Sequence, residues 1–248
     1  MDLNGHVAVV TGASRGVGLK IAEALEARGM VVVSVARSAA RFTADVSSTE
    51  DVARLKTKVE TELGRPTIVV NAAGIFGPIA LVKDSDPSQW IETIMIDAVG
   101  PYLVSRAFLG GMVDKGWGRI VNLSSAASLH TPGPMNSAYG TAKVALNQFT
   151  RHLAAELEGT GVTANVIHPG DMKTAMWADI RDKKDDAEGG ASGYDSWVSW
   201  VDETGGDPPE KAAKLVIDII ESDVNGRFLW IDDPLQTPIP SWGDSADS

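Results

Sequence analysis

The chain has 248 residues, of which 44% are hydrophobic and 22% charged, a composition typical of a single globular domain. It contains no cysteine, which excludes disulfides, thiolate metal sites and cysteine nucleophiles; we expect no metal site and a cytoplasmic location. The net charge of −11 comes entirely from residues 171–248, where 18 acidic residues face 7 basic ones, and this disfavours nucleic acid and anionic membranes as partners.

The beginning of the chain, MDLNGH, has no basic segment before an apolar core, and it leads directly into a strand-like run. This predicts that no signal peptide is present. No apolar run approaches the roughly 18 residues that a membrane span needs.

Short apolar, largely β-branched runs alternate along the chain with segments of helical period. The strand-like runs are 7–10, 31–35, 68–70, 120–123, 162–167 and 227–231, and the helical segments are about 17–28, 48–63, 88–115, 137–158 and 209–222. Strands that are apolar on both faces and separated by helices are typical of a parallel sheet covered on both sides. We therefore predict one α/β domain over residues 1–248, with a doubly wound, Rossmann-type sheet of about seven strands.

Two segments break this alternation. Residues 175–209 are rich in Asp, Gly and Trp with little periodicity, which predicts a long loop that acts as a substrate lid. Its large side chains would either close a pocket or anchor the loop to the core: Met176, Trp177, Tyr194, Trp197 and Trp200. Residues 234–248 contain three prolines and few apolar anchors, and we interpret them as a C-terminal tail.

A glycine-rich turn, TGASRGVG, follows the first strand and opens the first helix. Gly12 suits a tight turn, Gly16 lets backbone approach a pyrophosphate, and Gly18 lets the helix pack close to the strand. The N–H groups at the start of the helix favour phosphate. The spacing is GxxxGxG rather than GxGxxG. The turn predicts a dinucleotide-phosphate site that comprises Gly12, Ser14, Arg15, Gly16, Val17 and Gly18.

The end of the second strand bears on which nucleotide binds. An acidic residue there would bind a ribose 2′-hydroxyl, whereas arginine suits a 2′-phosphate. The sequence reads Val35-Ala36-Arg37-Ser38 with no acid, and Arg15 lies in the glycine-rich turn. Two guanidinium groups favour NADP(H) over NAD(H). The alternative is that Arg37 is only a solvated strand end.

Tyr139 and Lys143 are four residues apart in a helical segment and so share one helix face. A carbonyl that takes up a hydride also needs a proton, and a free phenol with a pKa near 10 is a poor proton donor and acceptor at neutral pH. A nearby Lys⁺, together with an oxidised nicotinamide, would lower that pKa. By itself this pair is a common surface pattern.

Six motifs in one order change the interpretation of that pair. They are Thr11–Gly18, Asp45-Val46, Asn71–Gly74, Asn122–Ser125, Tyr139–Lys143 and Pro169–Thr174. With them the chain resembles the short-chain dehydrogenase/reductase family, in its soluble single-domain branch, over residues 5 to about 232.

The resemblance implies that Tyr139 is the general acid/base, and that Lys143 holds the nicotinamide ribose and lowers the Tyr139 pKa. It implies that Ser125 bonds the substrate oxygen, with Ser124 as the neighbouring alternative. The further cofactor contacts that it implies are Asp45, Val46, Asn71, Ala72, Gly74, Pro169, Gly170, Met172 and Thr174. A homodimer or homotetramer, joined through the helices near 88–115 and 137–158, is also implied.

Three features depart from the family pattern. Asp97 stands where the family has a catalytic Asn; a carboxylate still accepts hydrogen bonds from water and Lys143, but its charge would keep Lys143 protonated, and a drifted, non-catalytic site is the alternative. The helix commonly found between strands two and three is missing after Arg37, which leaves Arg41 as a further phosphate candidate. The segment from Ser125 to Tyr139 is one residue longer than usual.

Three other side chains lie near the expected site. His130 and Met135, in the serine-to-tyrosine loop, are candidates for the substrate pocket, and His168 is interpreted as structural.

These features predict an oxidoreductase that transfers a hydride between NADP(H) and a small carbonyl or alcohol substrate, with the acidic surface disfavouring a polyanionic one. One alternative is an NADP(H)-binding sensor on the same fold with little turnover. Another is an enzyme that recycles the nicotinamide during epimerisation or dehydration.

Overall fold

The computed structural model describes residues 2–38, 40–129, 133–183 and 192–232, so His130 and the predicted tail at 234–248 lie outside the described residues. Seven parallel strands form one sheet in the order β3-β2-β1-β4-β5-β6-β7. Their bounds are Val7–Thr11 (β1), Val31–Ala36 (β2), Phe42–Thr43 (β3), Ile68–Asn71 (β4), Gly118–Leu123 (β5), Val162–His168 (β6) and Phe228–Trp230 (β7). The predicted doubly wound sheet is confirmed.

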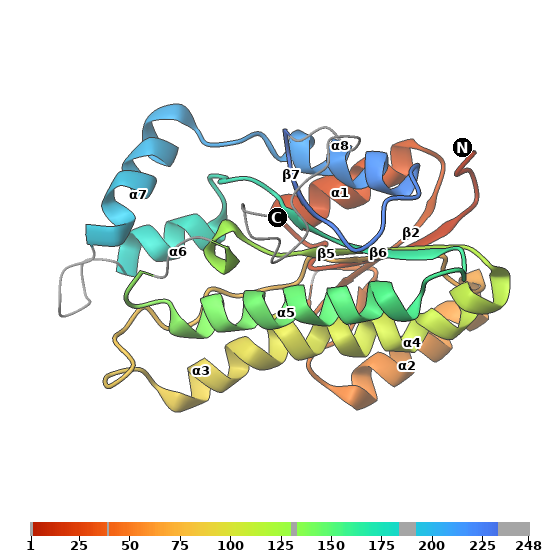
Figure 1. Ribbon diagram of the computed structural model, residues 1–248, viewed down its shortest axis with the longest axis horizontal. Helices are drawn as coiled ribbons and strands as arrows, with labels where there is room; N and C mark the ends of the chain where they lie inside the picture. The colour runs from red at the N-terminus through yellow and green to blue at the C-terminus, as the bar shows by residue number, and fades with distance from the viewer. Residues whose placement is uncertain (1, 39, 130–132, 184–191, 233–248) are drawn as a thin grey trace, which may run out of the picture.

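Helices cover both faces of this sheet (Figure 1). On one face lie α1 (Gly16–Ala27) and α8 (Pro209–Ile220), and on the other α2 (Thr49–Leu63), α4 (Gly100–Lys115) and α5 (Ser137–Glu156). Successive side chains of a strand point to opposite faces. Ala8 and Val10 accordingly pack in the core with α1 and α8, whereas Val7 and Val9 pack in the core with α2 and α4. This explains why the strands carry apolar residues toward both faces.

The strand order reverses its direction of growth next to β1. The chain builds outward from β1 through β2 to β3 and then returns to place β4 on the other side of β1. At such a switch point the loops from β1 and β4 diverge and leave a crevice at the carboxyl edge of the sheet. The glycine-rich turn after β1 and the segment after β4 therefore face each other there.

The predicted helix over 88–115 consists of three parts. A regular helix, α3 (Pro87–Ile94), is followed by a π-helical turn, η1 (Met95–Val99), and then by α4. A π-helical turn shifts the side chains around it and is frequent at functional sites. It places Asp97 on the buried side, with 0% of the residue exposed.

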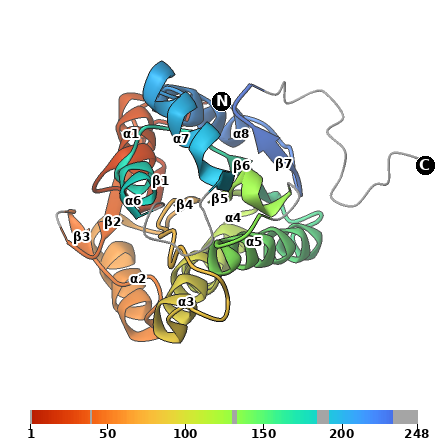
Figure 2. The same ribbon diagram turned by 90° about the vertical axis from the view of Figure 1, so that its left-hand side faces the viewer.

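The prediction of an irregular loop over 175–209 is wrong for most of its described part, which forms two helices. These are α6 (Ala175–Lys183) and α7 (Ser192–Thr204), at one end of the molecule (Figures 1 and 2); we name them the lid helices after the lid predicted from the sequence. Trp177 packs against Val198 and Val201 in a small cluster that joins the two helices. This cluster is local to the two helices, so the apolar period that marks a helix packed on the main core is weak here.

The expected absence of a helix between Arg37 and Asp45 agrees with the structure, where the described residues of that stretch contain only the two-residue strand β3. No helix in the described ranges has the length and apolar character that a membrane crossing requires.

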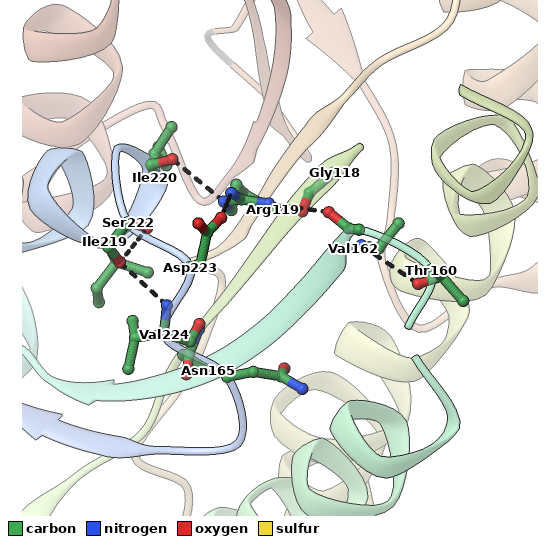
Figure 3. Close-up of polar contacts among 12 residues, drawn as sticks. Gly118, Arg119, Thr160, Val162, Asn165, Ile219, Ile220, Ser222, Asp223 and Val224 are labelled. Atoms are coloured by element: carbon green, nitrogen blue, oxygen red, sulfur yellow. Dashed lines mark hydrogen bonds and ion pairs between the residues drawn. The ribbon is translucent and has the colours of Figure 1, made fainter. Parts of the chain in front are cut away.

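At the edge opposite the lid helices, a buried arginine joins three parts of the fold (Figure 3). The Arg119 guanidinium on β5 donates hydrogen bonds to the carbonyl oxygens of Ile220 (3.2 Å), Gly118 (2.9 Å) and Gly161 (3.1 Å), and it pairs with Asp223 Oδ1 at 2.7 Å. Ile220 ends α8, so a cation lies where the helix leaves carbonyl groups unpaired. Arg119 therefore attaches the end of α8 to the central sheet.

Candidate active site

The glycine-rich turn forms a cradle in which two positions admit no side chain. A Cβ at Gly12 would lie 2.7 Å from Ala72 O, and one at Gly18 would lie 2.4 Å from Gly12 O. At Gly16 the backbone is left-handed (φ 58°), and a Cβ would meet nothing closer than Thr174 Cγ2 at 3.9 Å. The turn thus has no room for a side chain at Gly12 or Gly18, whereas the space beside Gly16 is open.

The start of α1 in this turn has free hydrogen-bonding capacity. Arg15 occupies the N-cap position of α1 and makes no side-chain capping bond, so no cap side chain occupies the first N–H groups of the helix. Such a helix start attracts anions, and Gly16, at that start, is exposed. The cradle fits a dinucleotide pyrophosphate.

Across the crevice, the segment after β4 is held to β1. Thr11 Oγ1 accepts hydrogen bonds from the N–H groups of Ala72 (3.1 Å) and Ala73 (3.2 Å). The Asn71 side chain faces the scaffold, because its amide donates to Asn122 Oδ1 at 2.8 Å and to Ser105 Oγ at 3.1 Å. Among the predicted cofactor contacts, Asn71 is therefore one whose side chain already has protein partners.

The arginine candidates lie near the end of β2. Arg15, Arg37 and Arg41 are all exposed; Arg37 Nη1 is 3.9 Å from Glu92 Oε1, and the Arg41 guanidinium lies over the Phe42 ring. At Asp45, hydrogen bonds from Ser47, helped by the charge of Arg37, hold the pKa below its ordinary value. Val46, beside Asp45, is buried against Gly100.

Tyr139, Lys143 and Asp97 are brought together under the carboxyl edge of the sheet. Tyr139 lies in the first turn of α5 and is 8% exposed, and Lys143, one turn later, is 4% exposed. Lys143 Nζ lies 2.9 Å from Asp97 Oδ2, donates to Leu123 O at 3.1 Å and is 5.3 Å from the centre of the Tyr139 ring. Two partners therefore hold the ammonium beside the tyrosine.

Asp97 is fixed in turn by the segment after β4. Its Oδ1 accepts a hydrogen bond from the Ile75 N–H at 2.8 Å. A Cβ at Gly74 would lie 2.9 Å from Asp97 Oδ2 and 3.5 Å from Lys143 Nζ, so a larger residue at position 74 would displace the ion pair. The segment after β4, with Gly74 and Ile75, thus contacts the Asp97–Lys143 ion pair and also borders the predicted cofactor site.

The charges of this cluster set its proton equilibria. Burial raises the pKa of Asp97, although Lys143 opposes this. Burial alone would lower the pKa of Lys143, but Asp97 and then Tyr139 outweigh it, so that the Lys143 pKa is raised and the group stays an ammonium.

The pKa of Tyr139 is raised chiefly by burial; Lys143 lowers it, Asp97 raises it, and a hydrogen bond with Ser125 lowers it. Lys143 was expected to lower this pKa together with an oxidised nicotinamide. In the protein alone burial outweighs the lysine, and the Asp97 carboxylate opposes it.

The two serine candidates differ in what they contact. Ser124 is buried against the scaffold, with its Oγ 3.4 Å from Ser128 Oγ and 3.5 Å from Lys143 O. The Ser125 hydroxyl accepts from Ala127 N–H at 3.2 Å and is close enough to Tyr139 to lower the pKa of its phenol. The geometry favours Ser125 as the serine that faces the tyrosine.

Three residues support this serine turn, and two of them, Ser128 and Asn147, were not predicted to do so. Ser128 Oγ donates to Ser125 O at 2.6 Å and accepts from Asn147 Nδ2 at 2.8 Å. His168 Nδ1 accepts from the Ala126 N–H at 3.2 Å, which agrees with its structural interpretation. Asn147 follows Lys143 by four residues, so the spacing that selected Tyr139 and Lys143, extended by one turn, would have found it.

The segment Pro169–Thr174 is the root of the lid helices. Met172 forms an antiparallel bridge with Gly206, and the Asp207 N–H donates to Asp171 O at 2.8 Å. Thr174 Oγ1 accepts from Trp177 N–H at 3.3 Å at the start of α6. The two ends of the lid segment are thereby held together beside the predicted nicotinamide contacts.

The lid side chains differ in their packing. Trp177 is 2% exposed and anchors α6 to α7, whereas Trp200 is 43% exposed. Met176 packs on the cluster around the Tyr139 ring, and Tyr194 and Trp197 pack on both that cluster and the Trp177 cluster. The cluster around the Tyr139 ring also contains residues that were not predicted: Phe76, Ile79, Ala127 and Ile180.

In the serine-to-tyrosine loop, Met135 is buried and has a left-handed backbone (φ 71°), and its carbonyl accepts from Ala80 N–H at 3.3 Å. Such a backbone is uncommon outside glycine and is often found near functional sites.

Comparison with known proteins gives consistent matches. A family model described as short chain dehydrogenase matches residues 6–185. The 3-oxoacyl-(acyl-carrier-protein) reductase FabG of Pseudomonas aeruginosa is 37% identical over 205 residues, which cover 75% of this chain and 82% of that protein. Galactitol 2-dehydrogenase (L-tagatose-forming) of Cereibacter sphaeroides is 33% identical over 93% of this chain and 94% of that protein.

Among solved structures, a gluconate 5-dehydrogenase from Burkholderia cenocepacia in complex with NADP and tartrate superposes with a TM-score of 0.81. The match covers 96% of this chain and 97% of that chain at 24% identity, and at this identity it shows the shared fold.

Proposed function

The chain belongs to the short-chain dehydrogenase/reductase family, a family of oxidoreductases that use nicotinamide cofactors, and we propose that it transfers a hydride between NADP(H) and a carbonyl or alcohol substrate. The observation that carries this proposal is the buried Tyr139 side chain, whose ring centre lies 5.3 Å from Lys143 Nζ and whose pKa, raised by burial, is lowered by both Lys143 and Ser125. A sensor protein that only binds the nucleotide has no need of this arrangement.

The residues of the site then have distinct tasks. Ser125 and Tyr139 hold the substrate oxygen between their hydroxyl groups, and Tyr139 gives it a proton during reduction or takes one during oxidation. Lys143 stabilises the phenolate that this leaves. NADP(H), when bound, supplies or accepts the hydride, so the reduced carbonyl gains one hydride and one proton.

Asp97 is proposed as the residue that positions Lys143. In this chain the carboxylate contacts the ammonium directly, at 2.9 Å, where the family has an asparagine. The direct contact keeps Lys143 charged and oriented, and Asp97 itself does not touch Tyr139 through any described hydrogen bond.

The cofactor site is proposed to follow the crevice between β1 and β4. Gly12, Ser14, Gly16, Val17 and Gly18 would hold the pyrophosphate, as the Cβ-free cradle allows. Arg15 and Arg37 would bind the 2′-phosphate, with Arg41 as a third candidate. The remaining contacts proposed are Asp45 and Val46 at the adenine, Asn71, Ala72 and Gly74 along the middle, and Pro169, Gly170, Met172 and Thr174 at the nicotinamide.

The proposed function is tested by following NADPH absorbance with a panel of aliphatic, aromatic and steroid-like carbonyls. We expect turnover that Tyr139→Phe lowers by about a hundredfold to ten-thousandfold, since that is the usual contribution of a general acid. Tyr102→Phe, at an exposed tyrosine of α4, is the matched control and should leave turnover unchanged. Tight NADPH binding without turnover on any carbonyl would favour the sensor, and turnover without net NADPH consumption would favour the epimerase or dehydratase alternative.

We also propose a homodimer or homotetramer that associates through the α3, α4 and α5 surface. Apolar side chains are exposed on these elements and on the π-helical turn between α3 and α4: Ile91 (57%), Met95 (36%), Tyr102 (44%) and Val144 (50%). Exposed apolar side chains gathered on adjacent helices are typical of an interface.

A further inference from the structure

The surroundings of the Tyr139 ring are apolar and come from three distant parts of the chain. Phe76, after β4, lies with its ring centre 4.8 Å from that of Tyr139 and 5.9 Å from that of Tyr194 on α7. Ile180, on α6, is 2% exposed in the same cluster. We refer to Phe76, Ile180, Tyr194, Trp197 and Met176 as the aromatic enclosure.

The charged groups near the enclosure would disfavour an anionic substrate. Of the charged groups that act on Tyr139, Lys143 is the cation, and it is paired with Asp97; the others, Asp97 and Asp171, are acids. A carboxylate or phosphate buried here would have no unpaired cation beside it among the groups that act on Tyr139.

Two cations in and beside the lid helices, Arg181 and Lys173, have partners outside the enclosure. Arg181 lies over the Trp177 ring and pairs with Asp182, while Lys173 lies over the same ring and pairs with Asp202. Both side chains thus contact the Trp177 ring, and their charges are paired with Asp182 and Asp202; Tyr194 and Trp197 connect the Trp177 cluster to the aromatic enclosure.

One buried polar atom of the enclosure has no hydrogen-bond partner among the described residues. The Tyr194 hydroxyl makes no hydrogen bond of good geometry there, although the nearby Asn136 side chain lowers its pKa. Burial nevertheless raises the pKa of Tyr194 to about 12, so the hydroxyl is a neutral donor at ordinary pH. Buried hydroxyl groups are nearly always hydrogen-bonded, and one without a partner suits a ligand oxygen.

We propose that the substrate is an uncharged, largely apolar ketone or secondary alcohol with a second oxygen beside the reacting one, and that Tyr194 determines specificity by donating a hydrogen bond to that second oxygen. The aromatic enclosure takes the apolar body of the substrate, and Ser125 and Tyr139 hold the reacting oxygen. This inference rests on the proposed function. The proposed substrate class differs from two alternatives, polyols and carboxylate-bearing substrates.

The test measures kcat/KM with NADPH for four ketones: a cyclic monoketone, a cyclic 1,2-diketone of the same ring size, an open-chain ketose and a keto acid. We expect kcat/KM for the two cyclic ketones to exceed that for the keto acid and the ketose by about a hundredfold or more. The reason is that the charged and polar groups of the latter two substrates would find no partner in the site. Of the two cyclic ketones, the diketone should have the higher kcat/KM.

The role of Tyr194 is separated by two variants of the same helix. Tyr194→Phe keeps the ring and should lower kcat/KM for the diketone by about tenfold, the size expected for one hydrogen bond, while leaving the monoketone unchanged. Trp200→Phe, at the exposed tryptophan of α7, should change neither. Calorimetric binding of the diketone to the protein loaded with NADP⁺ gives a second readout, in which Tyr194→Phe should weaken binding by a similar factor.

Two results would overturn the inference and leave the proposed function standing: faster reduction of the keto acid or ketose than of the cyclic ketones, or an equal effect of Tyr194→Phe on both cyclic ketones. If no ketone of any class is reduced although NADPH binds, the proposed function itself fails, and the inference fails with it. Thermal unfolding shows whether each variant is folded. Diketone binding is then compared between folded Tyr194→Phe and folded Trp200→Phe, and weaker binding by Tyr194→Phe alone supports the role of its hydroxyl.

Discussion

At the scale of single residues, Asp97 affects the tyrosine site in two opposite ways. It holds the Lys143 ammonium at 2.9 Å, which keeps the charge that favours a phenolate. Its own negative charge raises the pKa of Tyr139, which opposes the phenolate. An asparagine would still accept a hydrogen bond from Lys143 but would add no charge. The substitution Asp97→Asn therefore separates the two effects.

For Asp97→Asn we expect turnover within about tenfold of the wild type and a shifted pH profile. Alcohol oxidation needs the deprotonated Tyr139, so its rate rises with pH through the Tyr139 pKa. Asp97 raises that pKa, and its removal lowers it; the rising limb of kcat/KM should then move to lower pH. The measurement is the pH profile of oxidation with NADP⁺. A fall in turnover of about several hundredfold would show instead that the carboxylate has a specific role in proton transfer. A limb that does not move would show that the Asp97 charge does not set the Tyr139 pKa.

The residue at the end of β2 gives a second prediction at this scale. Ala36→Asp would place a carboxylate next to Arg37, where it would repel a 2′-phosphate and bind a ribose 2′-hydroxyl. We expect the ratio of kcat/KM for NADPH to that for NADH to fall by at least about tenfold, with Ala36→Ser as the uncharged control. A ratio that hardly changes would count against the NADP(H) assignment.

At the scale of secondary-structure elements, Arg119 links the end of α8 to the sheet far from the lid. The Arg119 side chain is 1% exposed while that of its ion-pair partner, Asp223, is 96% exposed, so solvent screens the Coulomb attraction. The bonds to three backbone carbonyls are buried or partly buried, and burial lowers the pKa of Arg119 although the group remains charged at ordinary pH. We infer that the hydrogen bonds of Arg119 contribute more to the stability of the fold than its ion pair with Asp223 does.

Arg119→Met should lower the free energy of unfolding by about 2–4 kcal/mol, because it leaves buried carbonyl groups without donors. The control is Arg28→Met, which removes an exposed ion pair with Glu221 at the same end of α8 and should cost less than about 1 kcal/mol. Urea unfolding of both variants measures the difference. Equal effects would mean that the buried bonds of Arg119 contribute no more than a surface pair.

At the scale of the whole molecule, the position of the site follows from the order of the strands. Loops from β1, β4, β5 and β6 carry, in turn, the glycine-rich turn, Gly74 with its neighbours, the serines and the root of the lid. All four strands are parallel, so these loops leave the sheet at one edge, and α5 supplies Tyr139 and Lys143 from below it. The lid helices lie at that end of the molecule (Figure 2).

The proposed assembly is tested on the intact protein by sedimentation velocity. Val144→Glu, on α5, should shift the population toward a smaller species, because a charge buried in an interface is strongly unfavourable. Val82→Glu, at an apolar residue that is 73% exposed and lies outside these helices, is the matched control. A wild type that sediments as a monomer would contradict the assembly outright.

The sequence predicted the parts of the fold and site that depend on local pattern. Short, largely β-branched apolar runs located every strand except β3, and residues of helical period located most helices. The spacing of Tyr139 and Lys143 placed both on one helix face. The π-helical turn at Asp97 was missed because its apolar pattern is that of an ordinary helix. The lid helices were missed because Trp177 packs on α7 rather than on the main core. Phe76 and Ile180 have no motif, so nothing in the sequence marked them as neighbours of Tyr139.

By itself, the sequence determined the doubly wound sheet, the turn that only glycine fits, and the pairing of Tyr139 with Lys143, because each depends on residues close together in the chain. Only the tertiary structure decided that Asp97 contacts Lys143 directly, that Ser124 is buried against the scaffold, and that Tyr194 packs in the cluster around the Tyr139 ring. These are contacts between segments far apart in sequence. Their geometry follows from how the helices and loops pack at the carboxyl edge of the sheet.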